Sequence, residues 1–146
     1  MVVGAGIAEP VGREELRELV ERTLAELNAD DRRGPVLRAS GMSARLVISD
    51  LELVVDVAAS EGPDDFLRWS FGGDADWEPE IELEMDSATA HRLLQGDESL
   101  AVAIARRRVR CSCRSRAAVA FLPAARLIAE RYRGVVADRR PGPAVG

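Results

Sequence analysis

The stretch from Ile81 to Arg133 constrains the fold more than any other part of this chain. It opens at Ile81–Met85 with apolar and acidic residues in strict alternation, the period-two pattern of a strand with one buried face. Asp86 follows as an N-cap for a helix over Ser87–Gln95, and Gly96 suits the left-handed residue that ends a helix. A strand that runs directly into a capped helix predicts a sheet covered by helices.

The segments before this stretch predict one helix and three strands. Apolar residues recur at three- and four-residue spacing over Arg13–Asn28, which predicts an amphipathic helix. Residues 28–41 are polar and interrupted by Gly34-Pro35, which predicts a loop or a short helical turn. Period-two alternation predicts strands over Ala44–Asp50, Leu51–Ala58 and Phe66–Phe71. The short turns between successive strands predict antiparallel pairing.

The segments after the first capped helix predict two more helices and a fifth strand. Asp97 is a candidate cap for a helix over Glu98–Arg106, and Arg107–Arg114 returns to period two. A helix over Ser115–Arg133 follows, kinked or restarted at Pro123 because proline lacks the backbone N–H that the helix needs. Together the elements predict an α+β fold, with a five-stranded, mostly antiparallel sheet and helices packed on one face.

The chain length predicts a single domain, which we place at residues 13–133. A chain of 146 residues buries roughly 70% of its unfolded surface in one core. Residues 1–12 predict a flexible leader, and residues 134–146, rich in proline, glycine and arginine, predict a disordered tail. The leader holds Gly4-Ala5-Gly6, which resembles a dinucleotide-binding loop. However, Glu9 stands where the third glycine belongs and no full strand precedes the loop.

Charge and composition narrow the class of partner. The net charge is −5 and the pI about 5.0, which argues against nucleic acid or an anionic membrane as a general partner. No apolar run approaches the length of a membrane span, and the N-terminus lacks the features of a signal peptide, so we expect a cytoplasmic protein. All 20 basic residues are arginine, which is typical of a GC-rich bacterial genome.

No pattern of residues predicts a catalytic or metal site. His91 is the only histidine, and no local spacing gives it both an activated nucleophile and an orienting acid, so we interpret it as a partly buried structural residue. Cys111 and Cys113 point the same way from one strand, where a mutual disulfide would be strained and two further metal ligands are lacking. We therefore expect no cofactor, no metal and two small core residues.

The strongest local charge signal is a run of arginines around the fifth predicted strand. Its members are Arg106, Arg107, Arg108, Arg110, Arg114 and Arg116. The run could hold an anionic headgroup or an acidic partner. The interpretation that we favour is the wet face of an edge strand, with its charges paired to nearby carboxylates. No aromatic residues stand between the arginines, which disfavours single-stranded nucleic acid.

Several segments of the second half together resemble a known family. They are the strand–helix junction Met85–Ala90, the turn Leu94–Gly96, the helix Ala101–Arg106, the basic strand ending at Cys113, and the pairs Leu122-Pro123 and Tyr132-Arg133. In this order they are similar to the sterol carrier protein type-2 family, in particular its small bacterial members. The likeness covers about Ala44 to Arg133, and the first predicted helix fits the family's N-terminal helix.

The resemblance implies a non-catalytic carrier with a hydrophobic tunnel between sheet and helices. The tunnel would hold an apolar small molecule such as a fatty acyl chain, a sterol or a similar lipid. The residues that we expect to line it are Trp69, Phe71, Leu83, Met85, Leu93, Leu100, Ile104, Phe121, Leu122, Ile128 and Tyr132. Trp69 suits a core as well as a pocket wall, whereas Trp77 suits a loop rim.

Two positions depart from the family pattern. Family members usually have glycine where this chain has Arg107 and Cys113. We therefore expect a fifth strand whose ends differ from those of the family, and a smaller pocket near Cys113.

Two other functions stay open at the level of the sequence. One is an interaction module, for instance a homodimer, with a filled core and the arginine run or a sheet edge as its partner face. The weaker one is an enzyme that acts on a lipidic substrate through His91 or a carboxylate. Periodicity does not reveal a cavity, so the presence or absence of one decides between carrier and filled module.

Overall fold

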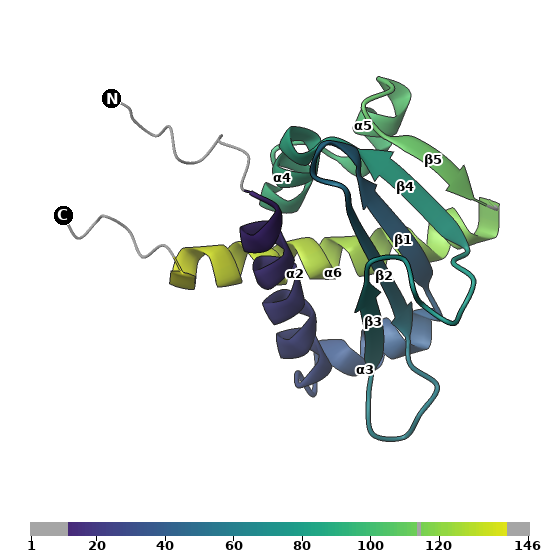
Figure 1. Ribbon diagram of the computed structural model, residues 1–146. Coiled ribbons are helices and arrows are strands. Elements are labelled where there is room, and N and C mark those ends of the chain that lie inside the picture. Colours follow the sequence, from purple (N-terminus) through teal and green to yellow (C-terminus); the bar gives the residue numbers. More distant parts are fainter. Residues whose placement is uncertain (1–11, 114, 140–146) are drawn as a thin grey trace.

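The computed structural model describes residues 12–113 and 115–139, which form a sheet crossed by helices (Figure 1). The helices are α2 (Arg13–Asn28), α3 (Arg33–Ser40), α4 (Ser87–Gln95), α5 (Leu100–Ala105) and α6 (Ser115–Arg139). The strands are β1 (Ser43–Ile48), β2 (Leu53–Ala59), β3 (Leu67–Phe71), β4 (Ile81–Met85) and β5 (Arg110–Cys113), and a 3-10 turn, η1 (Ser49–Leu51), joins β1 to β2. The predicted α+β class is confirmed.

The sheet is mixed, and its strand order is β3-β2-β1-β4-β5. Three neighbouring pairs are antiparallel, as predicted, but β1 and β4 are parallel. The expected pairing of β4 with β3 is wrong because the chain crosses back to the far side of β1. Two glycines with positive φ, Gly72 (93°) and Gly73 (81°), begin this crossing, and the Glu80 N–H donates to the Ser43 carbonyl at 3.0 Å where it ends.

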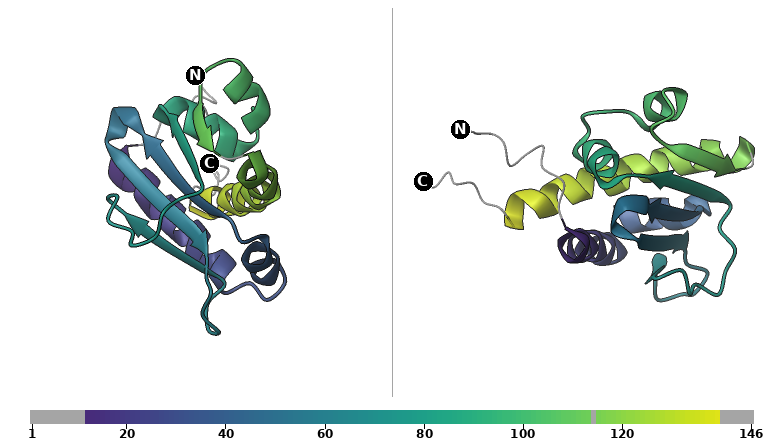
Figure 2. Two further views of the ribbon diagram at one scale, coloured as in Figure 1. Left: turned by 90° about the vertical axis from the view of Figure 1, so that its right-hand side faces the viewer. Right: turned by 45° about the horizontal axis from the view of Figure 1, so that its top comes forward.

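Helices cover one face of the sheet. On β4, Ile81, Leu83 and Met85 are at most 4% exposed and face the helices, while Glu82 and Glu84 point the other way. Figure 2 shows α3, α4 and α6 together on one side of the strands, and α2 packs against both α6 and β3. This layering agrees with the prediction of helices on one face.

The opposite face of the sheet carries a buried ion pair. Asp56 on β2 is 0% exposed, and its carboxylate accepts hydrogen bonds from Arg45 Nε at 2.8 Å and Arg45 Nη2 at 3.4 Å. The two residues are direct cross-strand partners on β1 and β2. The hydrogen bond to Asp56 raises the pKa of Arg45 above its ordinary value, so this guanidinium is charged throughout the physiological range.

The start of α4 is fixed by two carboxylates. Asp86 Oδ1 accepts a hydrogen bond from the Thr89 N–H at 2.8 Å, and this bond lowers the pKa of Asp86. Asp50 in η1 accepts from the Ser87 N–H at 2.8 Å and from the Ser87 hydroxyl at 2.7 Å. Gly96 at φ 83° ends the helix, so the predicted bounds of this helix are confirmed.

The polar segment before β1 contains an eight-residue helix, α3, where we predicted a loop or a short helical turn. Asp30 Oδ1 accepts hydrogen bonds from the N–H groups of Arg32 (2.8 Å) and Arg33 (2.9 Å), which holds the turn that starts the helix. Leu37 then anchors it, because this side chain is completely buried. Gly41 ends it at φ 64°.

The region around α5 also differs from the prediction. Its cap is Ser99, whose Oγ accepts from the Val102 N–H at 3.1 Å, and the expected cap Asp97 is wrong. Arg107 has a left-handed backbone at φ 63°, so the chain turns there and β5 begins only at Arg110. The strand thus starts three residues later than the predicted Arg107, and how its ends compare with those of the family stays a prediction.

The last helix is longer than predicted. It passes through Pro123 and Gly134 and continues to Arg139, so the prediction of a disordered tail is wrong for residues 134–139. Val135 is only 1% exposed, and Asp138 pairs with Arg22 of α2 at 2.9 Å, so contacts with the domain hold these turns. Residues 1–11 and 140–146 of the predicted leader and tail lie outside the described residues.

Candidate ligand-binding cavity

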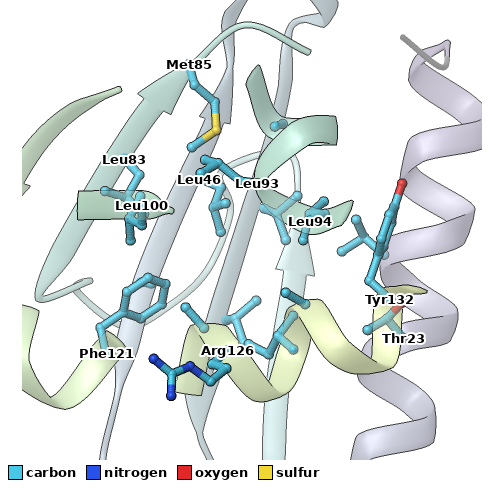
Figure 3. Close-up of a pocket in the computed structure, with 18 of the residues that line it drawn as sticks. Thr23, Leu46, Leu83, Met85, Leu93, Leu94, Leu100, Phe121, Arg126 and Tyr132 are labelled. Atoms are coloured by element: carbon cyan, nitrogen blue, oxygen red, sulfur yellow. The ribbon is translucent and has the colours of Figure 1, made fainter. Parts of the chain in front are cut away.

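An apolar cavity of about 590 Å³ lies between the sheet and its helical cover. This volume is within the roughly 300–1,000 Å³ of typical small-molecule pockets. Its floor is formed by inward residues of the three central neighbours β2, β1 and β4, and its walls and roof by α2, α4, the start of α5, and α6. In Figure 3, Leu46, Leu83 and Leu100 point into the space above α6.

The cavity exists because small side chains stand where the helices face the strands. Ala90 on α4 and Ala125 and Ala129 on α6 line it, and so does Ala44 on β1. Alanine side chains are too short to cross the gap between two layers, so the larger residues around them do not meet in the middle.

Eight of the eleven side chains that we predicted for the tunnel line this cavity. They are Leu83, Met85, Leu93, Leu100, Phe121, Leu122, Ile128 and Tyr132. Tyr132 is completely buried and Phe121 is 5% exposed, whereas Leu122 is 45% exposed.

The other three predicted residues lie elsewhere. Trp69 and Phe71 are on β3, at the edge of the sheet, and α2 packs against this strand. The Arg17 guanidinium of α2 lies 4.5 Å from the centre of the Phe71 ring. Ile104 lines a second hollow beside β5, together with Glu82, Glu84 and Arg110. Trp69 and Phe71 were misplaced because we took β3 as a neighbour of β4. Ile104 was misplaced for another reason, because its side of α5 borders β5 and not the cavity.

Two groups of lining residues were missed by the sequence analysis. Helix α2 contributes Leu16, Val20, Thr23 and Leu24, and strands β1 and β2 contribute Leu46, Ile48, Leu53, Val55 and Val57. The available signal was the period-two pattern of the first two strands, although Val47 and Val54 make it less regular than that of β4. It identified the buried face but not the position of these strands in the sheet.

The cavity has a closed end and a mouth. Lining residues from the strands are buried or half-buried, whereas all the exposed ones belong to two segments. The first segment, Gly96–Ala101, joins α4 to α5, and the second is the face of α6 from Leu122 to Arg133. The mouth therefore opens between the α4–α5 connection and α6.

Polar groups that line the cavity are few, and Thr23 and Glu98 both have contacts within the protein. The Thr23 hydroxyl donates to the Leu19 carbonyl at 2.7 Å. At the mouth, Glu98 is held by Arg108 at 2.6 Å and by Arg92 at 3.9 Å. The Thr23 hydroxyl is thus satisfied within the protein, so an apolar ligand in the interior does not leave it without a partner. At the mouth, the buried Glu98 Oε1 has no hydrogen-bond partner among the described residues.

The other candidate residues lie away from the cavity. His91 is 4% exposed on α4 and does not line it. Cys111 is half-buried opposite Leu83, and the side chain of Cys113 lies outside the described residues. Among the residues described, no group of three or more histidine, cysteine or acidic side chains is placed to hold a metal ion.

The arginine run is partly neutralised by carboxylates, as the interpretation that we favoured requires. Arg108 pairs with Glu98, and Arg110 lies 3.7 Å from Glu84 on the neighbouring strand. Arg106 and Arg107 are exposed, and the side chains of the last two members lie outside the described residues. Within residues 12–113 and 115–139, no helix combines the length and apolar character that a membrane span requires.

Comparison with known proteins gives matches at the level of structure alone. No protein-family model matches the chain, and no curated protein matches it either. TT1886 of Thermus thermophilus, a conserved hypothetical protein regarded as a candidate sterol carrier protein, superposes with a TM-score of 0.62. Its identity is 16%, over 81% of this chain and 86% of that one.

Two further matches differ in how much of the neighbour they cover. The ubiquinone synthesis protein UbiJ-SCP2 matches with a TM-score of 0.56 and 11% identity, over 82% of this chain and 96% of that one. The inverting sec-alkylsulfatase Pisa1 from a Pseudomonas species matches with a TM-score of 0.51 and 14% identity, over 62% of this chain. The present chain spans only 14% of that enzyme's length. The chain therefore has the fold of sterol carrier protein 2 and its relatives.

Proposed function

We propose that this protein is a non-catalytic carrier that encloses an apolar ligand, such as a fatty acyl chain, a sterol or a similar lipid. The observation that supports it is the cavity of about 590 Å³, with aliphatic walls and a mouth between the α4–α5 connection and α6. In this proposal the eight predicted residues that line the cavity contact the ligand. In this proposal the carrier acts in the cytoplasm.

The energetics of burial favour an alkyl chain in this cavity. Each methylene moved from water into an apolar site yields about 0.8 kcal/mol. Eight well-covered methylenes therefore yield roughly 6 kcal/mol before the cost of association. No charged residue has to enter the cavity for this gain.

The alternatives receive less support. A module with a filled core is at odds with a cavity of this size. Enzymatic use of His91 is not favoured, because the histidine is buried and stands outside the cavity lining. The alkylsulfatase likeness covers a small part of that enzyme and shares only the fold.

The first test places a charge on the cavity floor. Leu83 is 2% exposed on β4 and faces the cavity, so Leu83→Arg should abolish the uptake of a fluorescent fatty acid. Circular dichroism shows whether the fold survives the change. Unchanged uptake by a folded variant would contradict the proposal.

A milder substitution fills the cavity from the roof. Ala125 on α6 is half-buried and lines the cavity, so Ala125→Phe should lower uptake by occupying the space of the ligand. Ala25→Phe is the matched control, because Ala25 lies on the exposed face of α2 and does not line the cavity. Equal uptake by the two variants would count against a ligand in this cavity.

A further inference from the structure

The mouth of the cavity is locally basic on a protein whose net charge is −5. Four charged side chains line the cavity, and all of them are at the mouth: Glu98, Arg126, Glu130 and Arg133. Glu98 is already held by two arginines, Arg92 and Arg108. The remaining charges at the mouth are two arginines and one glutamate, all of them exposed.

These two arginines lack the ion pairs that occupy their neighbour on the same helix. Arg131 of α6 pairs with Asp30 at 2.9 Å and with Glu26 at 3.5 Å. Arg126 and Arg133 have no carboxylate oxygen within 4.0 Å among the described side chains, although Glu130 stands between them on the helix. A guanidinium at the rim of an apolar cavity is therefore available to an anion.

The position of Arg133 is set by the opposite wall of the mouth. Its Nη1 lies so close to the Gly96 backbone that a Cβ at position 96 would collide with it. The guanidinium thus reaches from α6 across to the end of α4. Arg126 lies seven residues earlier, two helical turns or about 10 Å along the axis, on the same lining face of α6. Figure 3 shows its side chain beside Phe121.

We propose that the ligand is an amphiphile with an anionic oxygen head, a carboxylate or a phosphate, which Arg126 and Arg133 bind at the mouth while the chain fills the cavity. This inference rests on the proposed carrier function and narrows it to one class of ligand. A neutral sterol or alcohol gains the same apolar contacts but forms no charge-assisted hydrogen bond with these guanidinium groups.

The experiment compares three ligands that share a twelve-carbon chain and differ only in the head group. Dodecanoic acid, dodecyl phosphate and dodecanol compete with the neutral probe Nile red for the full-length protein, at a pH at which both acids are ionised. At least one of the two anions should displace the probe at a concentration about tenfold lower than the alcohol, because one charge-assisted contact is worth about one factor of ten. The anion that binds more tightly identifies the head.

Variants of the mouth residues test whether these arginines cause the preference for an anionic head group. Arg126→Gln and Arg133→Gln should each reduce the preference for the anions over dodecanol. The double variant should remove it, lowering the affinity for the anions about tenfold more than the affinity for dodecanol. Glu130→Gln should increase the preference, since one opposing charge is lost. Arg32→Gln is the matched control, because Arg32 is exposed and does not line the cavity. Added salt should reduce the preference as well.

The outcomes separate this inference from the carrier function on which it rests. If all three ligands displace the probe equally, the carrier proposal stands and the anionic head is wrong. A preference for the anions that survives in the double variant also overturns the role of these arginines. If no ligand displaces the probe and the probe itself does not bind, the carrier proposal fails, and this inference fails with it.

Discussion

The apolar layer between sheet and helices has a packed half and a hollow half. In the packed half, where α2 and α3 meet β3, the side chains of Leu19, Leu27, Leu37 and Leu67 are at most 2% exposed and none of them lines the cavity. In the hollow half, where α4 and α6 face β1 and β4, Leu46, Leu93, Leu94 and Leu100 are only half-buried and line it. Both halves are built mainly from leucine, so residue type alone does not decide which half is filled.

The difference lies in how the helices are fastened and in what stands between the leucines. In the packed half, the Asn28 side-chain oxygen accepts hydrogen bonds from the N–H groups of Phe66 (2.8 Å) and Leu67 (3.0 Å), which draws the end of α2 onto β3. In the hollow half the helices present alanines to the sheet, among them Ala90 and Ala125. A helix held close packs like a protein interior, whereas one that presents alanine leaves room.

The largest expected effect compares the same truncation in the two halves. Leu27→Ala should lower the free energy of unfolding by about 3 kcal/mol, because it removes buried methylenes and opens a new void. Leu94→Ala should lower it by only about 1 kcal/mol, because Leu94 already borders empty space. Urea denaturation of both variants measures the two values. Equal losses would mean that the two halves are packed alike.

A smaller effect is expected at the mouth of the hollow half. Gly96→Ala should lower the free energy of unfolding by about 1 kcal/mol, because alanine is strained at φ 83°. The new methyl group also has to displace Arg133.

Gly134→Ala is the control for Gly96→Ala, and we expect it to change the free energy of unfolding in the opposite direction. Gly134 lies inside α6 with nothing within 4 Å of an added Cβ, so Gly134→Ala should stabilise the protein by about 0.5 kcal/mol. A loss of stability at both positions would contradict the role assigned to the left-handed backbone. Thermal denaturation followed by circular dichroism measures both changes.

The smallest effect on stability concerns Asp30, whose hydrogen bonds hold the turn that starts α3 in the packed half. It appears only at acidic pH. Hydrogen bonds from the N–H groups of Arg33 and Arg32 lower the pKa of Asp30 from 3.8 to about 2. A carboxyl group with a lowered folded-state pKa stabilises the protein above its unfolded pKa and loses this contribution as the pH falls. The stability of the wild type should therefore decline between pH 3.8 and about 2, and Asp30→Asn should remove part of this decline.

The neighbouring residue provides the control for the acid experiment. Asp31 is exposed, and the hydrogen bonds that start α3 end on Asp30 and not on Asp31, so Asp31→Asn is the matched control for the loss of a neighbouring carboxylate. Urea denaturation at a series of acidic pH values measures the slope for all three proteins. If Asp30→Asn does not flatten the slope, the turn that starts α3 does not depend on the ionised carboxylate.

Much of the fold was predictable because its signals are local. The bounds of α2, β4 and α4 agree with the prediction residue by residue. The three- and four-residue apolar spacing specifies α2, and the strict alternation specifies β4. The cap residues Asp86 and Gly96 specify the two ends of α4. In contrast, α3 begins with hydrogen bonds from backbone N–H groups to one aspartate side chain, within a polar segment that has no clear repeat.

The candidate site was less predictable than the fold, since its walls depend on which strands are neighbours. Alternation assigned Leu83 and Trp69 to buried faces, and the structure places only Leu83 at the cavity. The reason is the crossing that puts β4 beside β1 and leaves β3 at the edge. Period two specifies which face a side chain takes but carries no information about the partner strand.

The parallel pair at the centre of the sheet has a consequence for the order of folding. Leu46 pairs with Val55 through the hairpin of β1 and β2, whereas its pairing with Leu83 closes a longer loop that contains β2, β3 and the crossing. Loop closure over a longer chain costs more entropy, and such contacts slow the search for the native state. The hairpin side of the sheet should consequently assemble early, and the enclosure around the cavity is completed late, when the second half of the chain docks.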